Sequence, residues 1–210
     1  DGCRKGLDLY SALHDGAAAT FEDFVKCFEE ANGADLSQFS LWYHQAGTPL
    51  VSLSSGYAQA KGEFTLSLEQ MIPPTPGQST KEPMHIPLRF GLLSADGAEA
   101  TPSFVSGADV TGDVLHLNER RQTVTFSGIA SRPVVSLNRS FSAPVNLHFE
   151  QAPADLAHIA RHDGDLFARW QALNDLALPN LVDAAKKARS GEPVEANPVL
   201  ADTLIAIAGD

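Results

Sequence analysis

The chain has 210 residues, of which 43% are hydrophobic and 20% are charged, and its formal net charge at pH 7 is −11. This composition is typical of a globular protein and excludes collagen-like, coiled-coil and disordered chains. An acidic chain is poorly suited to bind the phosphate backbone of a nucleic acid or an anionic membrane, so we expect neither partner. The length allows one large domain or two small ones.

The cysteine content and the N-terminal residues indicate the cellular compartment of the protein. Cys3 and Cys27 are too few for a disulfide framework, and free thiols suit a reducing environment. No stretch approaches the roughly 20 apolar residues that a membrane span needs, and the polar start shows no signal peptide. We therefore expect a cytoplasmic protein. Because the sequence begins without Met, we also expect it to be a piece of a longer chain.

Residues 19–45 show a helical hydrophobic period. Thr20 can cap a helix N-terminus, Asn32-Gly33 can end that helix, and Asp35 or Ser37 can begin a second one. This region therefore predicts a short helical hairpin. Its periodic apolar residues are Phe21, Phe24, Val25, Phe28, Leu36, Phe39, Trp42 and Tyr43.

From Gly47 to Glu150 the hydrophobic period changes to two. Alternation in short segments separated by turn residues is typical of an antiparallel β-sandwich. Pro83 and Pro87 flank one segment, which predicts an edge strand, and residues 96–107 are predicted to form a loop. The predicted strands cover residues 51–53, 64–68, 86–92, 114–117, 123–126, 134–137 and 145–149.

After Glu150 the helical period returns. Asp163-Gly164 is expected to separate two helices, Pro179 to interrupt the second, and Asn197-Pro198 to begin the last. These helices are apolar enough to need partners, which suggests the beginning of a stack of helix pairs. The predicted fold class is therefore α+β, with a central sandwich flanked by helices.

The sharpest metal candidate is a pair of histidines. His158 and His162 lie four residues apart on a predicted helix, as do the histidines of the zinc motif HExxH. However, Ile159 stands where that motif has its glutamate, Arg161 would repel a cation, and no third ligand is evident. We interpret the pair as surface or interface histidines.

A nucleophilic site has little support. Ser11, His14 and Asp15 are the residue types of a hydrolytic triad, but they are close in sequence, and Asp15 fits a turn better. The chain has no G-x-S-x-G nucleophile elbow. Cys27 lies among aromatic residues and is expected in the core, and Cys3 has no evident base.

Three further features are interpreted structurally. Residues 109–113 lack the spacing of a calcium loop, and Asn138-Arg139-Ser140 is only a formal glycosylation sequon. Trp42 and Trp170 lie on apolar helical stripes and are expected to anchor packed elements. We therefore predict no catalytic, cofactor-binding or metal-binding residue in this chain.

Several separated motifs nevertheless occur in one characteristic order. They are residues 2–10, 14–16, 19–24, 35–49, 73–76, 83–88, 141–145 and 161–170. Together they resemble the bacterial aminopeptidase N family, zinc-dependent alanyl aminopeptidases of the gluzincin class. The resemblance spans nearly the whole chain, and it implies three parts. Residues 1–45 would be the end of the thermolysin-like catalytic domain, residues 46–150 an immunoglobulin-like β-sandwich, and residues 151–210 the first helices of a C-terminal α-helical domain.

The resemblance also implies a chemistry that this chain lacks. Members of the family remove N-terminal amino acids from peptides with one zinc held by HExxH and a downstream Glu, a GxMEN segment that binds the substrate amine, and an oxyanion Tyr. Neither motif is present, since Ile72 follows Met71 and His85 follows Met84. Nothing around Tyr10 or Tyr43 matches the tyrosine. We therefore expect a non-catalytic fragment that supports and connects the catalytic and helical domains, with the zinc elsewhere in the parent.

This interpretation predicts the partners and has two alternatives. The partners are the other domains of the same chain, and peptides as substrates of the parent. Self-association through surfaces exposed by truncation, around Phe39, Trp42, Leu204 and Ile205, is a by-product. The main alternative is a free-standing β-sandwich binding module without enzymatic activity. A regulatory paralogue that has lost its catalytic domain is the third possibility.

Overall fold

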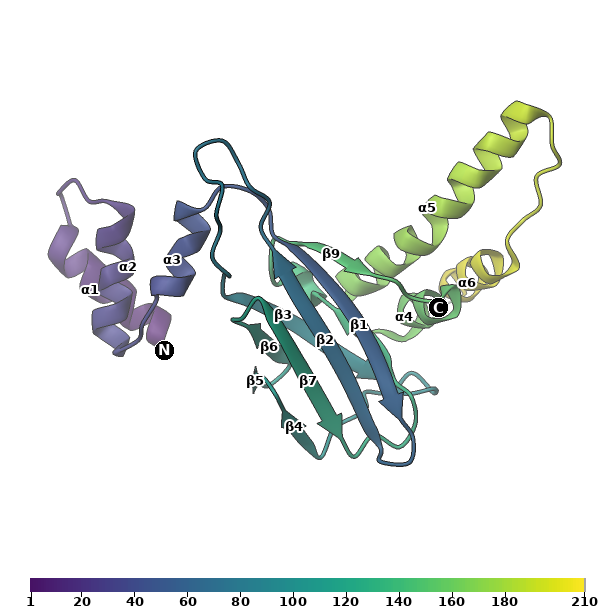
Figure 1. Cartoon of the computed structure of the whole chain (residues 1–210), viewed down its shortest axis with the longest axis horizontal. Helices are drawn as coiled ribbons and strands as arrows, with labels where there is room; N and C mark the ends of the chain where they lie inside the picture. Colours follow the sequence, from purple (N-terminus) through teal and green to yellow (C-terminus); the bar gives the residue numbers. More distant parts are fainter. Residues whose placement is uncertain (210) are drawn as a thin grey trace. The chain divides into compact units, whose positions relative to one another are not determined.

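The computed structural model describes residues 1–209 and divides into two compact units (Figure 1). The first unit contains Asp1–Gly47 and Ile72–His85, and the second contains Thr48–Met71 and the residues from Ile86 onward. Because residues 72–85 belong with the N-terminal helices, the chain leaves the second unit after Met71 and returns to it at Ile86.

The first unit is built on three helices, α1 (Gly2–His14), α2 (Phe21–Asn32) and α3 (Ser37–His44). Thr20 caps α2 through a reciprocal capping box with Asp23, and Gly33, with φ of 60°, ends the helix. The two helices predicted after Thr20 are therefore confirmed. Helix α1 is an addition to the expected hairpin, and it packs on α2 through an edge-to-face contact between Tyr10 and Phe24 at 5.1 Å.

The segment Ile72–His85 is attached to α3 by polar contacts. The Nζ atom of buried Lys81 donates hydrogen bonds to the carbonyl oxygen of Ala46 at 2.8 Å and to Thr75 Oγ1 at 2.9 Å. Trp42 Nε1 donates to the carbonyl oxygen of His85 at 2.9 Å. Trp42 therefore anchors packed segments, as the sequence indicated.

The second unit contains a sandwich of two β-sheets followed by helices, in agreement with the predicted α+β fold class. Its sheets have the strand orders β4-β7-β2-β1-β9 and β5-β6-β3-β8. Strand pairs are antiparallel except β1 and β9, which run parallel with Leu50 opposite Asn146. Strand β4 lies within residues 96–107, which were expected to form a loop, and β5 follows directly after that segment. The strands are β1 (Leu50–Ala58), β2 (Glu63–Met71), β3 (Ile86–Leu93), β4 (Phe104–Ser106), β5 (Asp109–Thr111), β6 (Val114–Leu117), β7 (Arg121–Ser127), β8 (Val134–Leu137) and β9 (Asn146–Phe149).

Alternating side chains of these strands form the sandwich core. The largest buried side chains include Phe64, Leu66, Ile86, Leu88, Leu92, Leu115, Leu117 and Phe126. The prediction of an edge strand next to Pro87 was wrong, because β3 lies between β6 and β8. Residues 86–89 pair with β6 and residues 90–93 pair with β8, so each half of β3 has one strand partner. This divided pairing tolerates a proline in an internal strand.

Three helices follow the sandwich: α4 (Pro153–His162), α5 (Leu166–Ser190) and α6 (Pro198–Ala208). The separation at Asp163-Gly164 and the start at Asn197-Pro198 are confirmed. The expected interruption at Pro179 was wrong, since α5 continues through it and Asn180 Nδ2 donates to the carbonyl oxygen of Leu176 at 2.7 Å. A buried cluster joins α4 and α5 to the end of β3: Leu93, Ile159, Ala160, Ala168 and Ala172.

Within residues 1–209, none of the helices combines the length and the apolar character needed to cross a membrane.

Candidate functional site

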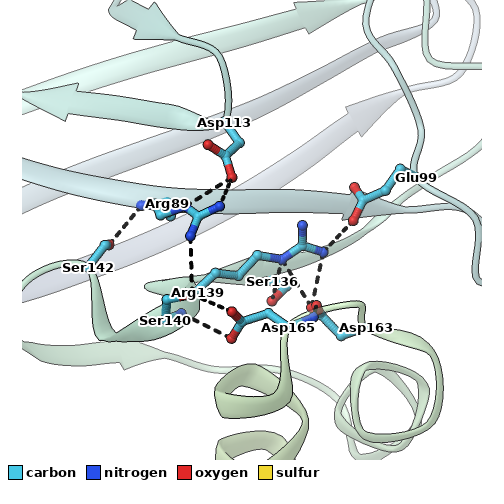
Figure 2. Close-up of polar contacts among 9 residues, drawn as sticks. All are labelled: Arg89, Glu99, Asp113, Ser136, Arg139, Ser140, Ser142, Asp163 and Asp165. Carbon is cyan, nitrogen blue, oxygen red and sulfur yellow. Dashed lines mark hydrogen bonds and ion pairs between the residues drawn. The ribbon is translucent and has the colours of Figure 1, made fainter. Parts of the chain in front are cut away.

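A buried ion-pair cluster joins the sandwich to helices α4 and α5 in the second unit (Figure 2). We call it the Arg139 junction; it consists of Glu99, Ser136, Arg139 and Asp163. Arg139 follows β8, Glu99 follows β3, and Asp163 ends α4. One guanidinium group therefore connects three segments that are distant in sequence.

The geometry of the junction is that of a strong, enclosed pair. Arg139 Nε and Nη2 lie 3.2 and 3.1 Å from Asp163 Oδ2, and Nη2 lies 2.6 Å from Glu99 Oε1. The side chain of Arg139 is 10% exposed and that of Asp163 is 0% exposed. A buried carboxylate without its cation would be strongly unfavourable, so the two side chains depend on each other.

A glycine makes room for the guanidinium group. A Cβ atom added to Gly91 would lie 1.9 Å from Arg139 Cζ, which is far inside van der Waals contact. Gly91 is on the internal strand β3, opposite Ser136 of β8. Because Gly91 has no side chain, the space beside β3 is open to the guanidinium group of Arg139.

The turn that carries Arg139 has an unusual backbone. Asn138, Ser140 and Phe141 have φ values of 56°, 56° and 51°, in the left-handed region that non-glycine residues rarely adopt. The Asn138 side chain supports this turn, because its Oδ1 accepts from Ala143 N at 2.9 Å and its Nδ2 donates to Ala143 O at 3.0 Å. Local hydrogen bonds thus stabilise this backbone conformation.

Asp165 attaches the same turn to α5. Its Oδ2 accepts from Ser140 Oγ at 2.6 Å, and its Oδ1 accepts from the backbone N–H of Ser140 at 3.0 Å and of Ala168 at 2.8 Å. The last of these bonds caps the N-terminus of α5. Burial acts to raise the pKa of Asp165, but these hydrogen bonds and the charge of Arg139 outweigh it, so the pKa is lowered.

A second ion pair extends this polar network along the four-stranded sheet, from β3 toward the turn between β5 and β6. Arg89 of β3 donates to Asp113 Oδ2 from Nε at 3.0 Å and from Nη2 at 2.6 Å, and its Nη1 lies 3.1 Å from Ser140 Oγ (Figure 2). The hydrogen bond from Arg89 lowers the pKa of Asp113. The side chains of the junction form hydrogen bonds and ion pairs with one another, so the arrangement is suited to fixing α4 and α5 on the sandwich.

The predicted histidine pair lies outside this network. The rings of His158 and His162 have centroids 4.7 Å apart, and His158 Nε2 lies 2.9 Å from the carbonyl oxygen of Ser94. His162 packs against Gly97, where a Cβ atom would lie 2.7 Å from its ring. Among residues 1–209, no three His, Cys, Asp or Glu side chains gather in a way that could hold a metal ion. The residues present therefore do not fit the zinc that the family resemblance implies.

The structure also places the other candidates from the sequence. The ring of His14 lies 5.2 Å from that of Tyr10, tilted by 30°, and no hydrogen bond between side chains joins Ser11, His14 and Asp15 among the described residues. Cys27 is buried, as expected, and both cysteines are free thiols. Trp170 is exposed and lies 5.6 Å from Phe167 between ring centroids, whereas Trp42 is half-buried, so the prediction that Trp170 anchors packed elements was wrong for the part of the chain that the structure describes.

The Arg139 junction was not predicted from the sequence. Arg139 is the middle residue of a formal sequon, yet Asn138 is buried and hydrogen-bonded, which leaves no room for a glycan. The sequence pattern assigns Asp163 to the separation between two helices. The available signal was that Asp163 and residues 141–145 belong to the motifs that carry the family resemblance.

Comparisons with known proteins agree with this architecture. Residues 47–150 match a family model described as a domain of unknown function (DUF3458) with an Ig-like fold. Over 97% of its length the chain is 34% identical to aminopeptidase N of Escherichia coli, and over 83% it is 45% identical to aminopeptidase N of Caulobacter vibrioides. These matches cover 23% and 19% of the two relatives.

A solved structure has a similar fold. The crystal structure of Legionella pneumophila aminopeptidase A in complex with aspartic acid superposes with a TM-score of 0.78 at 26% sequence identity. The match covers 98% of this chain and 22% of that one. Residues 47–150 thus form an immunoglobulin-like domain of the DUF3458 type, and the chain as a whole matches the segment of bacterial aminopeptidase N that contains this domain.

Proposed function

We propose that this chain is the non-catalytic connecting segment of a zinc metalloaminopeptidase that removes N-terminal amino acids from peptides. The observation that carries this proposal is the Arg139 junction, in which a buried ion pair fixes the following helices on the sandwich. A linker that must hold two larger parts in register needs such a junction, whereas a flexible tether does not. The aminopeptidase N relatives, roughly four times longer, supply the enzymatic context.

The proposal assigns a role to each part of the chain. Residues 1–45 would complete a catalytic domain, residues 46–150 would form the supporting sandwich, and residues 151–210 would begin a C-terminal helical domain. The partners would be those two domains of the same polypeptide. Peptides would be substrates of the longer protein, whose zinc would be held outside this segment. We place this hydrolase in the cytoplasm, in keeping with the free thiols of Cys3 and Cys27.

Zinc content and hydrolysis test the first part of the proposal. The purified chain should bind less than one equivalent of zinc by atomic absorption after dialysis, and it should not cleave an alanyl-arylamide substrate. A His158→Ala, His162→Ala double variant is the matched control, because it removes the only histidine pair with motif-like spacing that the sequence offers. Stoichiometric zinc with turnover, both lost in that variant, would overturn the proposal.

The coding sequence around this segment distinguishes a connecting segment from a free-standing module. If the segment connects domains, the coding sequence upstream of Asp1 should encode HExxH and GxMEN in the same frame. A start codon directly before Asp1 and a stop codon directly after Asp210 would instead favour a free-standing binding module.

A further inference from the structure

A groove lies between the edge strand β9 and helix α5, within the second unit. Two adjoining hollows, of about 90 and 380 Å³, share the lining residues Leu137, Leu147, Gln171 and Asp175 and so form one continuous groove. One wall is β9, and the other is α5, where Phe167, Gln171 and Asp175 follow at intervals of four residues. Figure 1 shows β9 beside the first turns of α5.

The strand wall can accept another strand. Strand β9 is the last of its sheet, and its strand partner is β1. An edge strand presents backbone donors and acceptors that pair readily with an added extended chain. A groove bounded by an edge strand and a helix gives such a chain hydrogen bonds on one side and side-chain contacts on the other.

The helix wall and the floor define what would fit. Leu147 is 36% exposed and Phe141 is 54% exposed, and the Phe141 ring lies 5.6 Å from that of Phe167, so apolar surface is open at the groove. Asp175 is the one charged residue among the described residues that line either hollow. Its Oδ1 accepts from Gln171 Nε2 at 2.8 Å, and its Oδ2 makes no hydrogen bond to any described residue.

We propose that this groove binds an extended peptide from a separate molecule, which adds to β9 as a strand and places a basic side chain against Asp175 and apolar side chains on Leu147 and Phe167. Charge complementarity supports a basic occupant, because the groove has a single carboxylate and the chain carries a net charge of −11. The inference concerns binding by this segment itself and does not depend on the proposed aminopeptidase role.

Isotope-edited NMR of the full 210-residue chain tests this site. The probe is the acetylated and amidated peptide Thr-Leu-Thr-Leu-Thr-Lys-Thr, whose leucines and lysine share one face of a strand. We expect saturable shifts in the amide signals of residues 146–149 and of Gln171. Asp175→Lys should weaken binding about three- to tenfold, as expected for reversing one exposed charge pair. Asp183→Lys, which reverses a charge elsewhere on α5, should leave affinity within about twofold.

A second peptide tests strand addition directly. N-methylation of alternate backbone amides removes the donors on one edge of the peptide, so one of the two possible methylation patterns should abolish the shifts while the other preserves them. The proposal is overturned by no saturable shift up to about 1 mM peptide, by equal sensitivity to both patterns, or by equal loss in the Asp175→Lys and Asp183→Lys variants. Concentration-dependent self-association that shifts the same amides would also overturn it, because the occupant would then be a second copy.

Discussion

Each unit of the protein contains a buried cation, and the two cations are used differently. Arg139 is paired with carboxylates 24 and 40 positions away along the chain, Asp163 and Glu99. Lys81 donates to the uncharged oxygens of Ala46, Thr75 and Gln78, two of which belong to its own loop. The planar guanidinium group pairs with two carboxylates from other segments, whereas the ammonium group binds neutral oxygens and joins its own loop to Ala46, 35 positions away. Removal of the two cations should therefore differ in size, because only the loss of Arg139 leaves a buried carboxylate without its cation.

The largest effect is expected from Arg139→Ala. It leaves the Asp163 carboxylate buried without its cation, which should lower the free energy of unfolding by about 3–5 kcal/mol. The measurement is urea unfolding of a Trp42→Phe background, so that fluorescence reports from Trp170 on α5 in the second unit.

Two further variants sharpen that result. Arg121→Ala, which breaks an exposed pair with Glu69 in which the Arg side chain is 77% exposed, should cost less than about 1 kcal/mol. The double variant Arg139→Met, Asp163→Leu removes both charges and should recover most of the stability. If Arg139→Ala costs no more than Arg121→Ala, the junction does not hold α4 and α5 on the sandwich.

A smaller, local effect is expected from Lys81→Met. The substitution keeps the buried aliphatic stem but leaves acceptors without a donor, which should cost about 1–3 kcal/mol. Fluorescence of Trp42 in a Trp170→Phe background should report the loss, because Trp42 is hydrogen-bonded to His85 at the end of the same segment.

The exposed Lys61 supplies the matched control for this change, because Lys61→Met should not shift the unfolding midpoint reported by Trp42 fluorescence. Amide hydrogen exchange should accelerate at Gln78 in Lys81→Met, since that N–H is bonded to Thr75 within the loop. An equal increase in the exchange rates of α5 amides would show that Lys81 stabilises more than its own unit, and the contrast between the two cations would fail.

Features that depend on neighbouring residues could be predicted from the sequence. The capping box at Thr20 follows from residues three positions apart, and the strands follow from alternation along one segment. The internal position of β3 could not be predicted from Pro83 and Pro87, because strand order depends on which segments pair across the sheet. The continuation of α5 through Pro179 could not be predicted either, because a proline inside a helical pattern usually ends or kinks the helix.

The Arg139 junction was out of reach for a related reason. Its ion pairs cross 24 and 40 residues, and neither periodicity nor motif spacing carries information over that range. Gly91 illustrates the problem, since it occupies an internal strand position where the local pattern favours a side chain. Only the pairing of β3 with β8 shows that the missing side chain makes room for Arg139.

The smallest effect is expected from Asp165→Asn, and it should appear as a pH dependence. The lowered pKa of Asp165 means that the unfolded chain binds a proton at a higher pH than the folded chain does. The carboxylate therefore contributes stability that is fully present above its ordinary pKa of 3.8 and is lost as pH falls through the lower folded value.

Asparagine can still cap α5 but does not titrate. The variant should lose less than about 1 kcal/mol at pH 6, and its deficit relative to the parent should shrink between pH 5 and pH 3. The exposed Asp202 of α6 provides the control, since Asp202→Asn should change the free energy of unfolding at pH 6 by less than about 0.5 kcal/mol. If the loss in unfolding free energy for Asp165→Asn stays constant over this range, the negative charge of Asp165 does not stabilise the turn that carries Arg139. The hydrogen bonds that asparagine can also make would then account for the whole contribution of this side chain.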